Sequence, residues 1–192
     1  EEELLVKKME DILLIYDAML SASADVIYTK RTEVIAEMKP LVAEFYAALS
    51  EEREETSLEY RSELQTASLS ELLLASRQKD FVNEHTTSGI HRDDVHFTIG
   101  EHPLRKFGSQ GQQKSFLVSL KFAQYEIMKR NYGFAPILLL DDVFDKLDMG
   151  RISNLLQMVA SNDFGQIFIT DSNKVRMSGI VDRLTQDRAY FE

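Results

Sequence analysis

Two segments of this chain carry residue types that bind phosphate groups and metal ions. Residues 108–114 read Gly-Ser-Gln-Gly-Gln-Gln-Lys, and the carboxylates of Asp141 and Asp142 follow the apolar run at 137–140. A serine hydroxyl, glycine backbone amides and the dipole of a helix N-terminus together form an anion site. A carboxylate pair held rigidly just past the carboxyl end of a buried strand can ligate magnesium and activate water. Together the two segments indicate chemistry on a nucleotide phosphate.

The phosphate-cradling loop of many ATPases, Gly-x-x-x-x-Gly-Lys-Ser/Thr, has no match in the 192 residues. Residues 108–115 come near to it, but Gln113 stands where the second glycine allows close approach of the backbone to phosphate. No apolar strand precedes the segment either. Taken alone, the turn at Ser109 is therefore either an anion site or a well-capped helix start. Likewise, Asp141 and Asp142 taken alone are either a metal site or loop carboxylates that cap a helix.

Composition excludes several classes of function. The chain has no cysteine, which rules out disulfides and thiolate chemistry. The net charge of −10 lies in residues 1–88, because acidic and basic side chains balance in residues 89–192. The acidic start of the chain differs from a signal peptide, and no apolar run approaches the roughly 20 residues that span a bilayer. We therefore expect a cytoplasmic protein with no membrane partner.

The first part of the chain, residues 1–88, has a helical pattern. Its apolar residues recur at intervals of three and four, which predicts two helices packed antiparallel like a coiled-coil arm. We expect Pro40 to begin a new helix or to kink the one that contains it. A weak strand pattern at 58–60 and a helix over 69–85 follow. The residues that carry the helical pattern are Leu5, Met9, Ile12, Tyr16, Met19, Ile27, Val34, Met38, Leu41 and Phe45.

The second part, residues 89–192, alternates between strand and helix patterns. Its predicted strands are 94–99, 137–140, 166–170 and, more weakly, 189–191, and its predicted helices are 115–130 and a segment around 152–159. The short apolar runs that follow helix breakers are typical of buried parallel strands. This alternation predicts an α/β fold with a parallel sheet.

The order of these segments resembles the head of ATP-binding-cassette proteins. Ser-Gln-Gly-Gln, a helix, an apolar strand ending in Asp-Asp and then Leu-Asp are similar to the signature motif, the Walker B strand and the D-loop. Residues 107–114, with Gly-Ile-His-Arg-Asp-Asp at 89–94 and Leu-Asp-Asp-Val at 140–143, resemble the RecF DNA replication and repair family in particular. The resemblance implies a helical arm domain at 1–88. It also implies the C-terminal part of an ABC-type ATPase head at 89–192, without its Walker A part.

The same resemblance implies a role for each residue of the turn. Ser109, Gly111, Gln112 and Lys114 would contact ATP held by a partner subunit, with the first three of them at its γ-phosphate. The common switch histidine is absent near Thr170, which leaves the γ-phosphate without a histidine sensor.

The carboxylate segment also takes its implied roles from the family. Asp141 would hold magnesium, largely through water. Asp142 would be the catalytic base, one methylene shorter than the glutamate of many cassette ATPases, so slow hydrolysis is expected. Asp145, Leu147 and Asp148 would cross the dimer seam as the D-loop, although Asp145 replaces a common serine.

What the resemblance implies for function is an ATP-dependent DNA-binding protein of recombinational repair, replication and the SOS response. Its cofactors would be ATP and Mg²⁺. It would dimerise on ATP, bind DNA at single-strand gaps and duplex junctions, and work with RecR and RecO to load recombinase. The chain alone is expected to be inactive as an ATPase, because it has no Walker A loop.

Other readings of the sequence are an SMC-like structural cassette head, whose arm would be far longer, and a non-enzymatic scaffold that associates with itself. A signalling receiver domain also carries an acidic pair, but it needs about a hundred residues after that pair, and too few follow Asp142.

Overall fold

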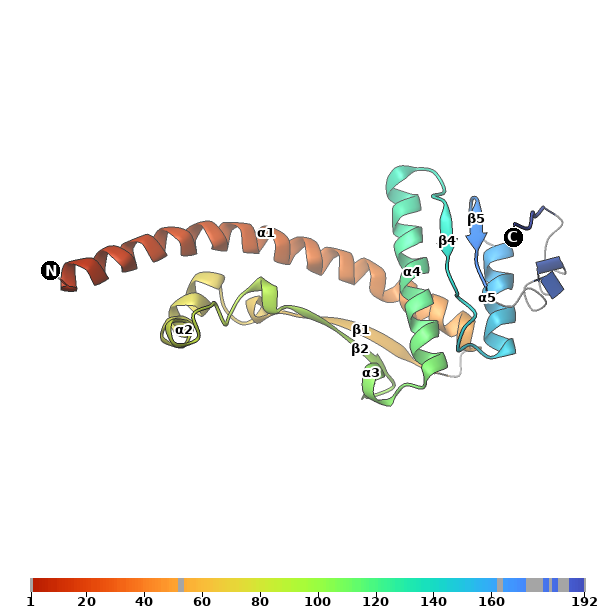
Figure 1. Ribbon diagram of the computed structural model, residues 1–192, viewed down its shortest axis with the longest axis horizontal. Helices are drawn as coiled ribbons and strands as arrows, with labels where there is room; N and C mark the ends of the chain where they lie inside the picture. The colour runs from red at the N-terminus through yellow and green to blue at the C-terminus, as the bar shows by residue number, and fades with distance from the viewer. Residues whose placement is uncertain are drawn as a thin grey trace. The chain divides into compact units, whose positions relative to one another are not determined.

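The computed structural model describes residues 2–51, 54–161, 164–171, 178–179, 181–182 and 187–191. One long N-terminal helix is followed along the chain by a mixture of shorter helices and strands (Figure 1). The elements are α1 (Glu2–Ser50), β1 (Thr56–Arg61), η1 (Glu63–Gln65), α2 (Leu69–Asn83), η2 (Ile90–Arg92), β2 (Asp94–Ile99), β3 (His102–Pro103), α3 (Leu104–Phe107), α4 (Gln110–Tyr132), β4 (Leu138–Leu140), α5 (Met149–Ser161) and β5 (Ile167–Ile169).

The chain divides into two compact units, and α1, β1 and β2 each contribute residues to both. The first unit comprises residues 1–36 and 58–96, and the second comprises 37–57 and 97–192. The sequence-based boundary near residue 88 falls within the first of these units. The assignment of 1–88 to an arm and 89–192 to a head remains a prediction.

The prediction of two antiparallel helices in the N-terminal part is wrong. A single helix, α1, runs without interruption from Glu2 to Ser50 and contains Pro40 in its interior. Proline removes one intrahelical hydrogen bond, but several residues after it are buried, and Phe45 and Leu49 of α1 pack in the core of the second unit. Such packing can hold a helix together across a proline. Leu41, Val42 and Tyr46 are among these buried residues. The two stretches of apolar periodicity therefore belong to one helix.

The first unit is held together by a small apolar cluster and by buried polar contacts. Ala24 of α1 packs with Leu69 and Leu73 of α2. The start of α2 has a reciprocal cap, in which Ser68 accepts from the backbone of Glu71 and the Glu71 carboxylate accepts from the backbone of Ser68. These contacts confirm the helix predicted over 69–85, which ends at Asn83.

Asp93 is the buried centre of the Gly-Ile-His-Arg-Asp-Asp segment. Its side chain is 3% exposed and accepts hydrogen bonds from Arg31 at 2.9 Å and from the Tyr60 hydroxyl at 2.5 Å. Arg31 also donates to the carbonyl of Ile90 at 2.8 Å. The segment thus forms a hydrogen-bonding cluster that ties α1 to the start of β2.

The second unit contains a two-stranded parallel sheet, which confirms the predicted mixed α/β class. Strands β4 and β5 pair in parallel, with Leu138 opposite Ile167 and Leu140 opposite Ile169. Helices α4 and α5 pack against this sheet, and α4 lies beside β4 in Figure 1. Their shared core includes Val118, Phe122, Leu138, Leu140, Phe144, Leu147, Ile152 and Leu155.

Two further strand predictions have different outcomes. The alternating segment at 94–99 is strand β2, and the weak pattern at 58–60 lies within β1. These strands join a second sheet, of order β1-β2-β3, in which β2 and β3 are antiparallel. The predicted strand at 189–191 is wrong, because these residues form no regular element. Three residues are too short a pattern to distinguish a strand from an irregular segment.

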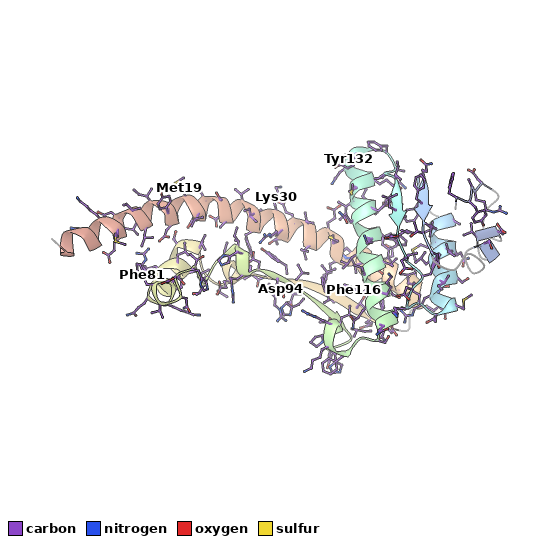
Figure 2. All side chains as sticks on the ribbon, in the orientation of Figure 1. Met19, Lys30, Phe81, Asp94, Phe116 and Tyr132 are labelled. Carbon is purple, nitrogen blue, oxygen red and sulfur yellow. The ribbon has the colours of Figure 1, made fainter. Side chains whose placement is uncertain are left out.

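By length and composition alone, the segment Lys7–Ser50 of α1 could cross a membrane. Core helices of soluble proteins meet the same criterion, so length and composition do not show that α1 spans a membrane. Asp17 interrupts the apolar stretch and forms an ion pair with Arg77 of α2 at 2.5 Å. Met19, labelled in Figure 2, is one of several exposed apolar residues on this helix. The absence of a membrane partner remains a prediction.

Candidate nucleotide-binding site

The Ser109 turn begins helix α4 with a reciprocal cap. The Ser109 hydroxyl oxygen accepts from the backbone of Gln112 at 3.2 Å, and the Gln112 side-chain oxygen accepts from the backbone of Ser109 at 2.7 Å. Of the first N–H groups of the helix, those of Gln110 and Gly111 are left for an outside acceptor. The Ser109 hydroxyl also keeps its own hydrogen to donate. A capped helix start and an anion site are thus compatible here, rather than alternatives.

Both polar atoms of the Gln112 side chain already form hydrogen bonds within the chain, which the sequence does not indicate. Its oxygen caps the helix, and its amide nitrogen donates to a carboxylate oxygen of Glu54 at 2.8 Å. Only one amide hydrogen remains for a nucleotide. Contact between Gln112 and ATP therefore stays a prediction, and the turn offers Ser109 and two backbone amides as its freest donors.

The turn lies directly against the segment that follows Asp142. A Cβ atom placed on Gly111 would come within 3.1 Å of the carbonyl oxygen of Lys146. On the next turn of α4, the Lys114 ammonium donates to the carbonyl oxygen of Asp142 at 3.0 Å. The two chemically suggestive segments of the sequence are thus in contact. Gly111 is required by this close approach rather than by its backbone angle.

The two aspartates stand at the carboxyl end of β4, as predicted. Leu138 and Leu140 of β4 are buried and fix the strand, while both carboxylates are exposed. Asp142 has a φ of 46°, in the left-handed region that aspartate tolerates better than most residues. Such a backbone conformation is held by its surroundings and is frequent at functional sites. Here it turns the chain sharply away from the strand.

Thr170 is a site residue that the sequence analysis considered only as the place of a missing histidine. Its hydroxyl donates to the Asp141 carboxylate and accepts from the backbone N–H of Asp142 at 3.1 Å. Its own N–H continues the sheet by donating to Leu140 at 2.9 Å. Thr170 therefore orients both aspartates from the end of the neighbouring strand. The sequence could have identified Thr170 by its position just after a predicted strand parallel to β4, because the carboxyl ends of parallel strands meet at one edge of the sheet.

The predicted D-loop residues differ in what they expose. Leu147 is buried in the core of the second unit, so its side chain holds the loop in place. The Asp145 and Asp148 side chains are exposed and available to a partner. Asp148 also caps α5, because its carboxylate accepts from the backbone of Arg151 at 2.9 Å.

A partly buried charged cluster beside the turn was not predicted from the sequence. The Glu54 carboxylate accepts from the Tyr46 hydroxyl at 2.5 Å and from Arg151, with both oxygens 3.2 Å from one guanidinium nitrogen. Burial raises the pKa of Glu54, but the hydrogen bonds from Tyr46, Gln112 and Arg151 outweigh it and hold this pKa below its usual value. Burial and the bond to Glu54 raise the pKa of Tyr46. Glu54 is therefore a carboxylate held ionised by its donors.

The residues at this edge suit only part of a nucleotide site. Within the described ranges, no group of three or more histidine, cysteine, aspartate or glutamate side chains could hold a metal. Magnesium often takes one or two carboxylates and completes its shell with water and phosphate oxygens. Asp141, with one oxygen bonded by Thr170 and its side chain exposed, fits that donor set. ATP and Mg²⁺ would have to bring the remaining ligands.

Curated RecF proteins are among the relatives of this chain. The DNA replication and repair protein RecF of Bacteroides thetaiotaomicron is 38% identical over 182 residues, covering 95% of this chain and 49% of the relative. RecF of Flavobacterium johnsoniae is 43% identical over 181 residues, covering 94% of this chain and 50% of the relative. The chain thus spans about half the length of the curated relatives it matches. No protein-family model matches it.

Solved structures of RecF proteins are also similar to this chain. A structure of the recombination mediator protein RecF with ATP, from the RecFOR pathway, superposes with a TM-score of 0.71 at 26% identity, covering 85% of this chain and 46% of that one. A second RecF structure, RecF-ATPrS, gives a TM-score of 0.70 at 27% identity, covering 86% of this chain and 46% of that one. The chain corresponds to a portion of RecF-like recombination mediators, and it belongs to the RecF DNA replication and repair family.

Proposed function

We propose that the chain supplies two parts of the ATP sites in a RecF-like, ATP-dependent DNA-binding protein. Asp141 and Asp142 serve the nucleotide of their own subunit, with Asp141 toward magnesium and Asp142 as the base for the attacking water. The Ser109 turn serves the nucleotide of a second subunit. ATP would therefore join two subunits, and its slow hydrolysis would release them.

The observation that carries this proposal is the contact between the turn and the carboxylate segment. Gly111 lies against Lys146, and Lys114 bonds to the carbonyl of Asp142, so both segments share one edge of the second unit. The turn offers hydrogen-bond donors, whereas the aspartates are acceptors that attract a cation. Hydrogen-bond donors can bind the γ-phosphate of one ATP. Carboxylates can bind the magnesium ion and the attacking water at a second ATP. One edge can thus contribute to two sites in a symmetric dimer.

The open face of the β4–β5 sheet also supports a larger protein around this chain. Leu139 of β4 is 65% exposed and Phe168 of β5 is 44% exposed. Parallel sheets are normally covered on both faces, and in the described residues this sheet has two strands, whose outer edges are unpaired. We propose that other elements of a full-length RecF protein cover this face, and that further strands, including the one before the phosphate-cradling loop, pair with the edges of the sheet.

The wider role follows from the family and is proposed for the protein as a whole. A full-length RecF protein carrying this chain would bind DNA at single-strand gaps and duplex junctions in the cytoplasm. It would act with RecR and RecO to load recombinase during repair and replication.

A substitution at Ser109 tests the proposal. In a full-length RecF protein carrying this chain, Ser109→Arg should abolish ATP-dependent dimerisation, measured by analytical ultracentrifugation, because a bulky cation replaces the small hydroxyl beside the phosphate. Loss of the helix cap would itself cost about 1 kcal/mol. Ser68→Arg is the matched control, since Ser68 caps α2 through the same reciprocal bonds. Unchanged dimerisation in Ser109→Arg, or equal loss in both variants, would contradict the proposal.

A further inference from the structure

Glu54 and Arg151 form the most enclosed ion pair of the described part of the second unit. The Arg151 side chain is 13% exposed and that of Glu54 is 21% exposed. Glu54 lies between the end of α1 and the start of β1, and Arg151 lies in the first turn of α5. The pair therefore joins the base of the long helix to the helix that follows the D-loop.

Arg151 makes three different contacts with its guanidinium group. One terminal nitrogen donates to the fully buried Ser115 hydroxyl at 2.8 Å, and the other lies 3.2 Å from both oxygens of Glu54. Its Nε is 3.4 Å from the carboxylate of Asp148. A planar guanidinium can reach all three groups at once, whereas a lysine ammonium is a single point charge. The arrangement therefore requires arginine specifically.

Glu54 extends this network to the Ser109 turn. Its carboxylate accepts from Gln112, and the same Gln112 side chain caps the helix at Ser109. Hydrogen bonds thus connect Ser109 through Gln112 and Glu54 to Arg151, and an ion pair connects Arg151 to Asp148. All of these residues belong to the second compact unit.

We propose that Glu54 and Arg151 are positioning residues that hold the Ser109 turn and Asp148 in one fixed arrangement for ATP-dependent dimerisation. This inference rests on the proposed function, in which the Ser109 turn serves the nucleotide of the second subunit, and on the contact across the dimer seam that the family resemblance implies for Asp148. Enclosed ion pairs contribute little net stability compared with apolar packing, because desolvation offsets their attraction. The ion pair instead fixes geometry, because it keeps the Ser109 turn and Asp148 in one relative position before ATP binds.

Arg151→Lys and Glu54→Gln test the inference in a full-length RecF protein carrying this chain. We expect both variants to weaken ATP-dependent dimerisation by about tenfold, as for the loss of one enclosed charged hydrogen bond. Without nucleotide, amide hydrogen exchange should become faster in residues 109–113 and stay unchanged at the other end of α4. Arg130→Lys is the control, because Arg130 forms an exposed pair with Glu126 at 3.0 Å on the same helix.

The outcomes separate this inference from the proposed function. If Ser109→Arg abolishes dimerisation but Arg151→Lys and Glu54→Gln leave both dimerisation and local exchange as in the wild type, the positioning role is wrong and the proposed function stands. If the two variants only lower the unfolding temperature, while dimerisation measured well below it is unchanged, the pair has a structural role and the inference fails. If Ser109→Arg has no effect, the proposed function fails first.

Discussion

The ammonium group of Lys114 donates a hydrogen bond to the backbone carbonyl of Asp142 at 3.0 Å. The contact joins the first turns of α4 to the left-handed residue that follows β4. Lys114 therefore stabilises the turn that places Asp142, in addition to any contact it makes with a nucleotide. The same lysine can link phosphate binding by one segment to the geometry of the other.

Removal of this amino group should slow hydrolysis. In a full-length RecF protein carrying this chain, we expect Lys114→Met to lower the rate of ATP turnover, because Asp142 loses one of the contacts that hold its backbone in place. A single hydrogen bond from a charged group is worth about 1.5–3 kcal/mol, so a fall of about tenfold is expected. Steady-state ATP turnover measures the effect. Lys121→Met, an exposed lysine of the same helix, should retain wild-type turnover; similar losses in both variants would contradict the role.

Thr170 should set the magnesium requirement. Its hydroxyl donates to the Asp141 carboxylate and accepts from the backbone of Asp142, so Thr170→Val removes both bonds while keeping the side-chain shape. Asp141 would then lose its orientation, and more Mg²⁺ should be needed for half-maximal ATP turnover. Partners that orient a metal ligand typically change metal affinity by about 10- to 100-fold.

Thr170→Ser provides the control for this prediction, because serine keeps the hydroxyl and loses only a methyl group. Its magnesium dependence should stay near that of the wild type. Direct binding of Mn²⁺ in the presence of ATP, followed by electron paramagnetic resonance, gives a second readout that is independent of turnover. The role of Thr170 is wrong if valine and serine behave alike in both measurements.

Features set by neighbouring residues could be predicted from the sequence, whereas features set by contacts between distant residues could not. The cap at Ser109 and the strand that ends at Leu140 are local patterns, and the structure has both. The single helix through Pro40 was missed because the packing that holds it comes from residues far along the chain. Local rules assign proline to a helix start or kink, and tertiary packing overrode them here.

The residues of the candidate site also divide into those with a local sequence pattern and those that only the fold brings together. Its acidic pair and its glycine turn were visible as motifs, whereas Glu54, Arg151 and Thr170 were not. Glu54 and Arg151 are 97 residues apart, and only the fold brings them together. A lone glutamate or arginine in a sequence is normally a solvated surface residue, so no local pattern could separate this enclosed pair from the other charges.

Acid should weaken the second unit partly through Glu54. Hydrogen bonds from Tyr46, Gln112 and Arg151 outweigh the effect of burial and lower the pKa of Glu54 from its usual 4.5. A group with a lowered pKa in the folded state adds stability above its unfolded pKa, and this stability is lost as the pH falls through the folded pKa. We therefore expect the thermal unfolding midpoint of a full-length RecF protein carrying this chain to fall as the pH decreases below about 4.5.

Glu54→Gln should make that midpoint less sensitive to pH in this window, because the titrating group is gone, and should lower it at neutral pH, where Arg151 loses its partner charge. Calorimetric scans at a series of pH values measure both effects. Glu71→Gln is an informative control: the Ser68 hydroxyl lowers the pKa of Glu71, but glutamine can maintain that helix cap. The control should keep wild-type stability at neutral pH. Parallel pH profiles for wild type and Glu54→Gln would show that Glu54 does not contribute to the acid sensitivity.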